Sequence, residues 1–159
     1  SRIEFQVNPP IRQSKENRLA LIKFLKDGHI DYLATDHAPH SKEEKQKGIS
    51  GLTHLDTYGS VATWLMAEHG FSPADIARVC AQNPAKFLNE FISNKYGEIK
   101  EGGVGSLTIL NPNKSIKITA EVLKTKCGWS PFLGMTFPGS VVATIIKGKI
   151  YLSRTKFLQ

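Results

Sequence analysis

The hydrophobic and polar positions near the start of the chain follow two different periods. Residues 3–7 are apolar at every second position, which is typical of a half-buried strand, and the prolines of Asn8-Pro9-Pro10 end it. After Ser14, apolar residues recur at near-helical spacing as far as Asp27-Gly28, so we predict a helix that Ser14 caps. Residues 30–35 form a second strand-like run. A strand, a helix and a strand with short connections predict a βαβ unit with parallel strands.

Further helices are predicted in the middle of the chain. A polar loop follows residue 35 and extends to about Gly51, and a helix is predicted over residues 57–68. The sequence Ser72-Pro73-Ala74-Asp75 has a capping serine, a proline for the first turn and an acid three residues after the cap, so it predicts another helix start. Asn83-Pro84 begins a further short helix.

Beyond Asn94 the sequence changes character. Glycines become frequent, and residues 107–110, 141–146 and 150–152 are short strand-like runs. The last two runs are joined through Lys147-Gly148-Lys149, which predicts a hairpin. We therefore predict a βα part over residues 1–94 and a small, mostly β part over residues 95–159.

The composition excludes several classes of partner. The net charge is +7, from 21 Lys and Arg against 14 Asp and Glu, but the basic residues are scattered and accompany no nucleic-acid module, so we expect no nucleic-acid partner. No apolar run approaches the roughly 18 residues of a membrane helix, and the start has no apolar signal region. Cys80 and Cys127 form no CxxC pair, which is typical of reduced thiols. We expect a cytoplasmic protein that binds no membrane.

The stretch Ala34-Thr35-Asp36-His37-Ala38-Pro39-His40 carries the candidate chemistry. In a parallel βα barrel, catalytic side chains lie at the C-terminal ends of the strands, and Asp36 directly follows a predicted strand. A carboxylate at that position can bind a metal and accept a proton. Pro39 stiffens the turn and can present His40 to the same pocket. An exposed strand-to-loop turn accounts for the same residues, so the pattern alone leaves both interpretations open.

This stretch resembles the signature of the dihydroorotase family, within the amidohydrolase superfamily. Upstream, Val7-Asn8-Pro9-Pro10-Ile11-Arg12 is similar to that family's Val-Asn-Pro-Pro-Leu-Arg. The resemblance continues in order through Asn83-Pro84-Ala85-Lys86, residues 97–102 and 106–110, Ser130-Pro131-Phe132 and residues 145–150. It therefore covers nearly the whole chain.

The resemblance implies an activity and a set of site residues. Such enzymes use zinc to interconvert dihydroorotate and N-carbamoyl-L-aspartate in pyrimidine biosynthesis. By resemblance, Asp36 is the last metal ligand and the catalytic group that carries a proton to the leaving nitrogen. Substrate binding is assigned to the side chains of Asn8 and His40 and to the backbone of Gly51 and Leu52.

The sequence also departs from the family. The loop at residues 48–54 is shorter than the family's and lacks its proline, and Ser106 stands where an acid is common. The family's metal centre needs a His-x-His pair, a bridging acid or carboxylated lysine and two further histidines, whereas the five histidines here form no such pair. We therefore expect the C-terminal part of a (β/α)8 TIM-type barrel, with strands seven and eight and their helices, followed by an accessory β domain. Such a fragment should be inactive alone.

Two alternatives remain. Dihydropyrimidinase and allantoinase can carry a similar Asp-His pair, but the Ala-Pro-His and Asn-Pro-Pro sequences favour dihydroorotase. Inactive homologues act as structural partners of aspartate transcarbamoylase, and the retained Asp36, His40 and Asn8 argue against that role. The expected partners are the two substrates and a second copy in a homo-oligomer, with aspartate transcarbamoylase as a further candidate.

Other residues are assigned to packing or to the rim of the site. We expect Trp64, Met66 and Trp129 to pack in the interior, and Cys80 to be a small buried apolar group. His54 lies in the loop that should border the site.

Overall fold

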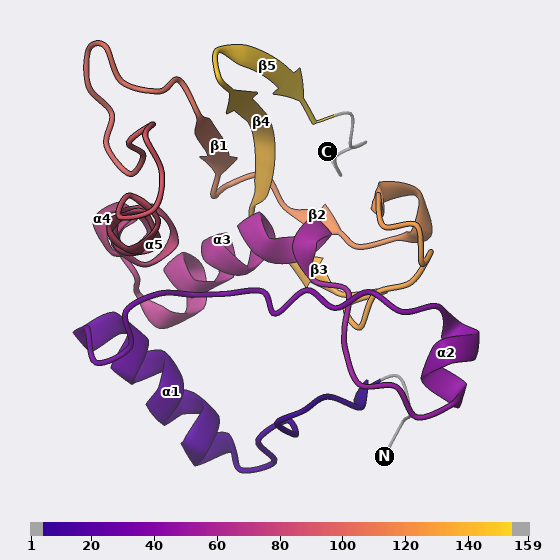
Figure 1. The fold of residues 1–159 in the computed structure, drawn as a ribbon. Helices are drawn as coiled ribbons and strands as arrows, with labels where there is room; N and C mark the ends of the chain where they lie inside the picture. The colour runs from indigo at the N-terminus through magenta and orange to yellow at the C-terminus, as the bar shows by residue number, and fades with distance from the viewer. Residues whose placement is uncertain (1–4, 154–159) are drawn as a thin grey trace.

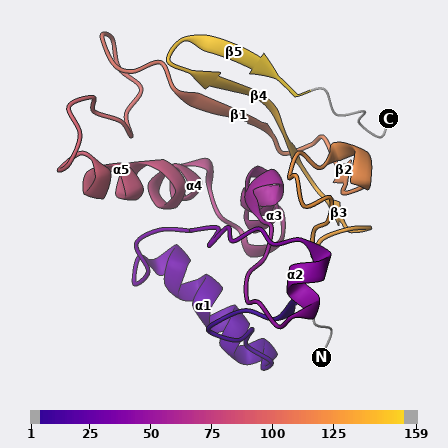
Figure 2. The same ribbon diagram turned by 45° about the vertical axis from the view of Figure 1, so that its right-hand side comes forward.

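The computed structural model describes residues 5–153 of the 159-residue chain. The helices are α1 (Lys15–Asp27), α2 (Lys42–Gln46), α3 (Tyr58–His69), α4 (Pro73–Ala77) and α5 (Asn83–Leu88), and a π-helical turn (Arg78–Gln82) joins the last two. The strands are β1 (Leu107–Asn111), β2 (Ile116–Lys117), β3 (Thr136–Phe137), β4 (Ser140–Ile146) and β5 (Lys149–Leu152). Figures 1 and 2 both show α3 between α1 and the three-stranded sheet.

Local capping determines where the first helix begins and ends, as predicted. The Ser14 hydroxyl accepts a hydrogen bond from the Asn17 backbone N–H at 3.1 Å, which satisfies one of the free donors of the first turn. At the other end Gly28 adopts a left-handed conformation (φ 85°), and its N–H donates to the carbonyl of Phe24. The prediction for α3 is confirmed to within one residue at each end.

The predicted helix start at Ser72 is also confirmed. The Ser72 hydroxyl accepts from the Asp75 N–H at 3.1 Å, and the Asp75 carboxylate accepts from the Ser72 N–H at 2.9 Å. The chain does not stop and restart before Pro84, however. It stays helical through the π turn, which widens the helix just where the proline ring would meet the carbonyl four residues earlier.

The two strands predicted in the first part are not formed. Of the first strand, residues 3 and 4 lie outside the described residues, and residues 5–7 are not in a strand. Residues 30–35 also form no ladder, although the Leu33 N–H donates to the Val79 carbonyl at 3.0 Å. The predicted parallel pairing is therefore wrong within residues 5–153. A strand exists only through hydrogen bonds to a neighbouring strand, and no strand lies beside these segments in the described part.

The second part contains an antiparallel sheet in the order β1-β4-β5. The predicted hairpin between β4 and β5 is confirmed, and its two turn residues, Lys147 and Gly148, both have positive φ (49° and 83°), as the tight hairpin turn requires. A second pair, β2 with β3, was not predicted, because two residues per strand are too few to show alternation. The strands β1, β3 and β4 contact α3. The boundary proposed near Asn94 stays a prediction.

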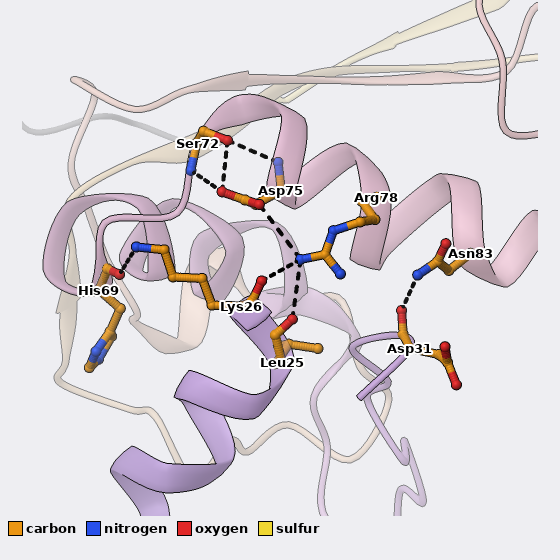
Figure 3. A network of polar contacts seen from close by, with 8 residues as sticks. All are labelled: Leu25, Lys26, Asp31, His69, Ser72, Asp75, Arg78 and Asn83. Atoms are coloured by element: carbon orange, nitrogen blue, oxygen red, sulfur yellow. Dashed lines mark hydrogen bonds and ion pairs between the residues drawn. The ribbon is translucent and has the colours of Figure 1, made fainter. Parts of the chain in front are cut away.

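The main core lies between α1, α3 and the α4–α5 helix. Its buried residues are Leu25, Ala62, Leu65, Phe71, Ile76 and Val79. Beside this core, the Arg78 guanidinium donates to the carbonyls of Leu25 (3.2 Å) and Lys26 (2.8 Å) at the end of α1, and also faces the Asp75 carboxylate (3.6 Å), as Figure 3 shows. A cation at the C-terminal end of α1 satisfies free carbonyls and complements the helix dipole, so it fixes α1 against α4.

No helix within residues 5–153 is long and apolar enough to cross a membrane.

Candidate functional site

The signature stretch, residues 34–40, begins with a tight turn at Asp36, and the residues after this turn lie beside residues 51–52. Asp36 is exposed and has a left-handed backbone conformation (φ 46°), which aspartate tolerates better than most residues. The Thr35 hydroxyl accepts from the His37 N–H at 3.2 Å. Beyond the turn, His37 and Leu52 form a parallel bridge, and the Ala38 N–H donates to the Leu52 carbonyl at 3.0 Å.

Gly51 touches the signature stretch so closely that no side chain fits there. A Cβ at this position would lie 2.5 Å from the Ala38 carbonyl oxygen and 3.0 Å from His40 Cδ2, and the backbone φ is +139°. Only glycine combines that conformation with that closeness. The structure thus brings together three of the predicted substrate-binding residues, namely His40, Gly51 and the buried Leu52.

The segment that carries Asn8 reaches the same loop through Gln6. The Gln6 carbonyl accepts from the Gly51 N–H at 3.1 Å, and the Gln6 side-chain amide donates to the Gly48 carbonyl at 2.9 Å. Asn8 itself is exposed, two residues beyond this attachment. Asn8, the fourth predicted substrate-binding residue, is therefore connected through Gln6 to the loop that contains Gly51 and Leu52.

Lys45 is a residue of this region that sequence reasoning missed. Its side chain is only 1% exposed, and its ammonium donates to the carbonyls of Gln6 (2.7 Å), Ile49 (2.8 Å) and Gly51 (2.9 Å). Burial lowers its pKa below the usual lysine value. The capping box of Ser41 and Glu44 starts α2 and so turns Lys45 inward. In the sequence it stands in a run of alternating charges, which indicates a solvated face.

His37 and His54 lie next to each other, and Asp36 is near His54. His37 Nδ1 accepts from the backbone N–H groups of His54 (3.0 Å) and Leu55 (3.2 Å), so in this arrangement the neutral ring carries its hydrogen on Nε2. Burial and the nearby His37 lower the pKa of His54, while Asp36 raises it. His54 thus lies next to His37, and its ring meets Phe132 edge-on with 5.5 Å between centroids. That its loop borders the site stays a prediction.

Trp129, from the β part of the chain, is hydrogen-bonded to residues of the candidate site. Trp129 is 3% exposed, which confirms that it packs in the interior. Its indole N–H donates to the His40 carbonyl at 2.7 Å, and its own carbonyl accepts from the Thr53 hydroxyl at 2.7 Å. His40 Nδ1 also lies 3.6 Å from the Glu44 carboxylate. The Trp129 indole thus holds the backbone of His40, and Glu44 lies next to the His40 ring.

The described residues do not by themselves form a metal site. Within residues 5–153, no group of three or more His, Cys, Asp or Glu side chains is arranged so that it could hold a metal ion. A catalytic zinc typically takes three protein ligands. Asp36 offers one exposed carboxylate, so any zinc bound there would need its remaining ligands from outside this part.

Comparison with known proteins identifies the family. Residues 7–151 match the amidohydrolase family. The chain belongs to this family. It is 39% identical over 148 residues to a dihydroorotase from Clostridium botulinum, which covers 92% of this chain and 36% of that protein. It is 35% identical over 150 residues to a dihydroorotase from Mycobacterium tuberculosis, with 91% of this chain and 34% of that protein covered. The amidohydrolase chain thus spans 34–36% of the length of these relatives.

Solved structures agree with the family. An L-hydantoinase (dihydropyrimidinase) from Arthrobacter aurescens superimposes with a TM-score of 0.81 at 28% identity, over 99% of this chain and 37% of that one. A dihydropyrimidinase from Brevibacillus agri gives a TM-score of 0.84 at 22% identity, over 98% of this chain and 35% of that one, which shows the shared fold alone. Members of the amidohydrolase superfamily have a TIM-barrel fold, so the predicted fold class is confirmed at that level.

Proposed function

We propose that this chain is the C-terminal part of a dihydroorotase, which interconverts dihydroorotate and N-carbamoyl-L-aspartate in pyrimidine biosynthesis. One observation carries the proposal: segments far apart in the sequence that bear the expected substrate-binding residues converge on one loop. His40 lies against Gly51, and Gly51 is bonded to Gln6, two residues before Asn8. The 39% identity to a dihydroorotase supports this choice of substrate.

In this proposal, residues 3–7 and 30–35 occupy the positions of barrel strands seven and eight. Both segments have strand-like sequences, and residues 5–7 and 30–35 lack neighbouring strands in the described part. A closed barrel supplies every strand with hydrogen-bond partners on both sides. These segments therefore become strands when the rest of the barrel is present, and residues 95–159 form the accessory β domain.

Asp36 is the proposed acid–base group. Hydrolysis of a cyclic amide adds water across the carbon–nitrogen bond, so the attacking water must lose a proton and the leaving nitrogen must gain one. An exposed carboxylate at the end of strand eight can accept the first proton and return it to the nitrogen. The left-handed turn directly after Thr35 sets the direction in which that carboxylate leaves the backbone.

The remaining site residues bind the substrate. The His40 imidazole binds the substrate carboxylate, the Asn8 amide binds the ring, and the backbone of Gly51 and Leu52 contacts it where no side chain intervenes. A zinc ion that Asp36 and ligands from outside the described part would hold supplies a Lewis acid and lowers the pKa of water. This chain alone is therefore expected to be inactive.

Hydrolysis of hydantoins or dihydropyrimidines is the second candidate function. The L-hydantoinase from Arthrobacter aurescens matches 99% of this chain with a TM-score of 0.81. Its 28% identity is below the 39% to a dihydroorotase, so the similarity favours dihydroorotate. A homo-oligomer, an association with aspartate transcarbamoylase and a cytoplasmic location are further parts of the proposal, which sedimentation, co-purification and cell fractionation test.

The test is a substrate panel on a full-length protein that contains these residues. Dihydroorotate, hydantoin and dihydrouracil are compared by kcat/KM, and dihydroorotate should have the highest value. As a control, removal of metal by a chelator should abolish hydrolysis, and added zinc should restore it. Faster turnover of hydantoin or dihydrouracil would replace the proposal by the second candidate. No hydrolysis of any of the three by a zinc-loaded, folded protein would favour the inactive scaffold.

A further inference from the structure

Lys45 is a buried cation that binds only carbonyl oxygens. Its side chain is 1% exposed, and its three ammonium hydrogens match three acceptors at 2.7, 2.8 and 2.9 Å. None of the ion pairs found within residues 5–153 includes it. All three ammonium hydrogens are therefore donated to backbone carbonyls.

This arrangement is costly for a residue that serves packing alone. Moving an ammonium group out of water is strongly unfavourable unless each donor finds an acceptor, and an apolar side chain would fill the same space at lower cost. What the ammonium adds is a link between distant backbone segments. It joins Gln6, two residues before Asn8, to Ile49 and Gly51 in the loop after the signature.

The link determines the orientation of one particular peptide group. The Gly51 carbonyl points to Lys45, and a peptide unit is planar and trans, so the Leu52 N–H is held in the opposite direction. On its other side the Gly51 N–H is bound to the Gln6 carbonyl at 3.1 Å. Both peptide groups of Gly51 are thereby fixed, while its Cα lies against Ala38 and His40.

We propose that Lys45 is a positioning residue for substrate binding, which sets the backbone of Gly51 and Leu52 and the spacing of Asn8 and His40 around the substrate. The inference rests on the proposed function and deepens it. Lys45 acts through these residues and does not itself touch the substrate, because its three donors are all taken.

The test is made in the full-length enzyme with Lys45→Met, which keeps the length of the side chain and removes the donors. Misplaced binding groups should raise KM for dihydroorotate on the order of tenfold to a hundredfold, with a much smaller change in kcat. Lys42→Met is the matched control, because Lys42 is exposed on the same helix and its variant should behave as wild type. A KM unchanged in Lys45→Met would overturn the proposal. A kcat that falls in proportion to lost folded protein, with KM unchanged, would show a purely structural role and would also overturn it.

Two further measurements keep the test decisive. Hydrogen exchange should increase in residues 46–53 of Lys45→Met and stay unchanged in α3; an increase spread over the whole protein contradicts a positioning role. If Lys45→Met does not fold, Lys45→Gln retains an amide donor and should give an intermediate KM, and a KM equal to wild type overturns the proposal. A failure of the proposed function can be told apart from a failure of this inference. In the first case the wild-type protein does not hydrolyse dihydroorotate, while the hydrogen-exchange data still show whether Lys45 orders residues 46–53.

Discussion

Trp129 donates its indole hydrogen to the backbone carbonyl of His40 at 2.7 Å, although 89 positions separate the two residues. The indole is buried, and the Trp129 carbonyl is bound in turn by the Thr53 hydroxyl. The β part of the chain therefore holds the backbone from which His40 projects. A residue that is remote in sequence can thus influence the proposed substrate contact.

The first prediction concerns this hydrogen bond. Trp129→Phe retains an aromatic ring and removes the donor, which leaves the His40 carbonyl without its indole partner. The free energy of unfolding should fall by about 1–3 kcal/mol, because the bond is lost and the part-buried His40 carbonyl is left without this partner. Urea denaturation of the full-length protein measures the loss. Trp64→Phe is the control, because Trp64 lies on α3 and packs against the main core. Its KM should stay at the wild-type value, whereas Trp129→Phe should raise KM; equal KM values in both variants would contradict the link to His40.

Asp36 is predicted to be essential for the reaction. Asp36→Asn keeps the size of the side chain but cannot accept the proton, so kcat should fall by roughly 10²–10⁴-fold in the full-length enzyme. His40→Ala should mainly raise KM, since His40 binds and does not transfer a proton. Steady-state kinetics with zinc content measured on each variant separates the two effects. An Asp36→Asn enzyme with near-normal turnover and full zinc would exclude the assigned role.

Gly51 is predicted to tolerate no side chain. In Gly51→Ala the added Cβ would meet the Ala38 carbonyl oxygen at 2.5 Å, so the loop must shift away from His40. Gly102→Ala is the control for a glycine without close neighbours, because it has a positive φ of 71° and nothing within 4 Å, whereas Gly51 has a φ of 139°. The control should lose only the conformational cost of about 1–2 kcal/mol, while Gly51→Ala should lose more and also raise KM. Equal stability and KM in the two variants would rule out the close contact as the cause.

The pH dependence of stability should contain a contribution from His54. Burial and His37 lower its pKa in the folded state below the value of 6.5 expected when unfolded. Between the two pKa values the unfolded state binds more protons, so unfolding becomes easier as pH falls below about 6.5 and this contribution is complete above it. His54→Gln should reduce that slope. Chemical denaturation between pH 5 and pH 8, together with the NMR titration of His54, provides the check; a titration midpoint at or above 6.5 would contradict it.

Local signals in the sequence predicted local structure well. Ser14, Gly28 and Ser72 specify helix ends through hydrogen bonds within one turn, and all three ends are confirmed. The hairpin at Lys147-Gly148 is equally local. The strand predicted over residues 30–35 was wrong because a strand depends on hydrogen-bond partners from distant parts of the chain. An apolar run does not reveal whether those partners are present.

The candidate site could be predicted only in part. The resemblance pointed to Asn8, His40, Gly51 and Leu52, and the structure supplies the contacts that join their segments. Lys45 could not be found in this way, because its inward direction follows from the five-residue helix α2 and from carbonyls up to 39 positions away. The charge pattern around it is the same as that of an exposed helix. The identity of a residue does not show whether its side chain hydrogen-bonds to distant backbone carbonyls.

The last prediction concerns the 159-residue chain by itself. Its helix α1 exposes Leu19, Leu21 and Phe24, and Tyr32 is exposed within residues 30–35, a segment that has no strand neighbour in the described part. Exposed apolar surface of this kind and unpaired backbone favour association. Because no group of three metal-ligating side chains forms around Asp36 within residues 5–153, the chain should bind zinc no more tightly than a surface carboxylate does, and it should not hydrolyse dihydroorotate. Mixing it with the N-terminal remainder of a dihydroorotase should restore zinc binding and turnover, since association would replace the covalent connection. Zinc stoichiometry, sedimentation and hydrolysis on the chain alone and on the mixture test this; tight stoichiometric zinc and turnover by the chain alone would show that it supplies a complete site.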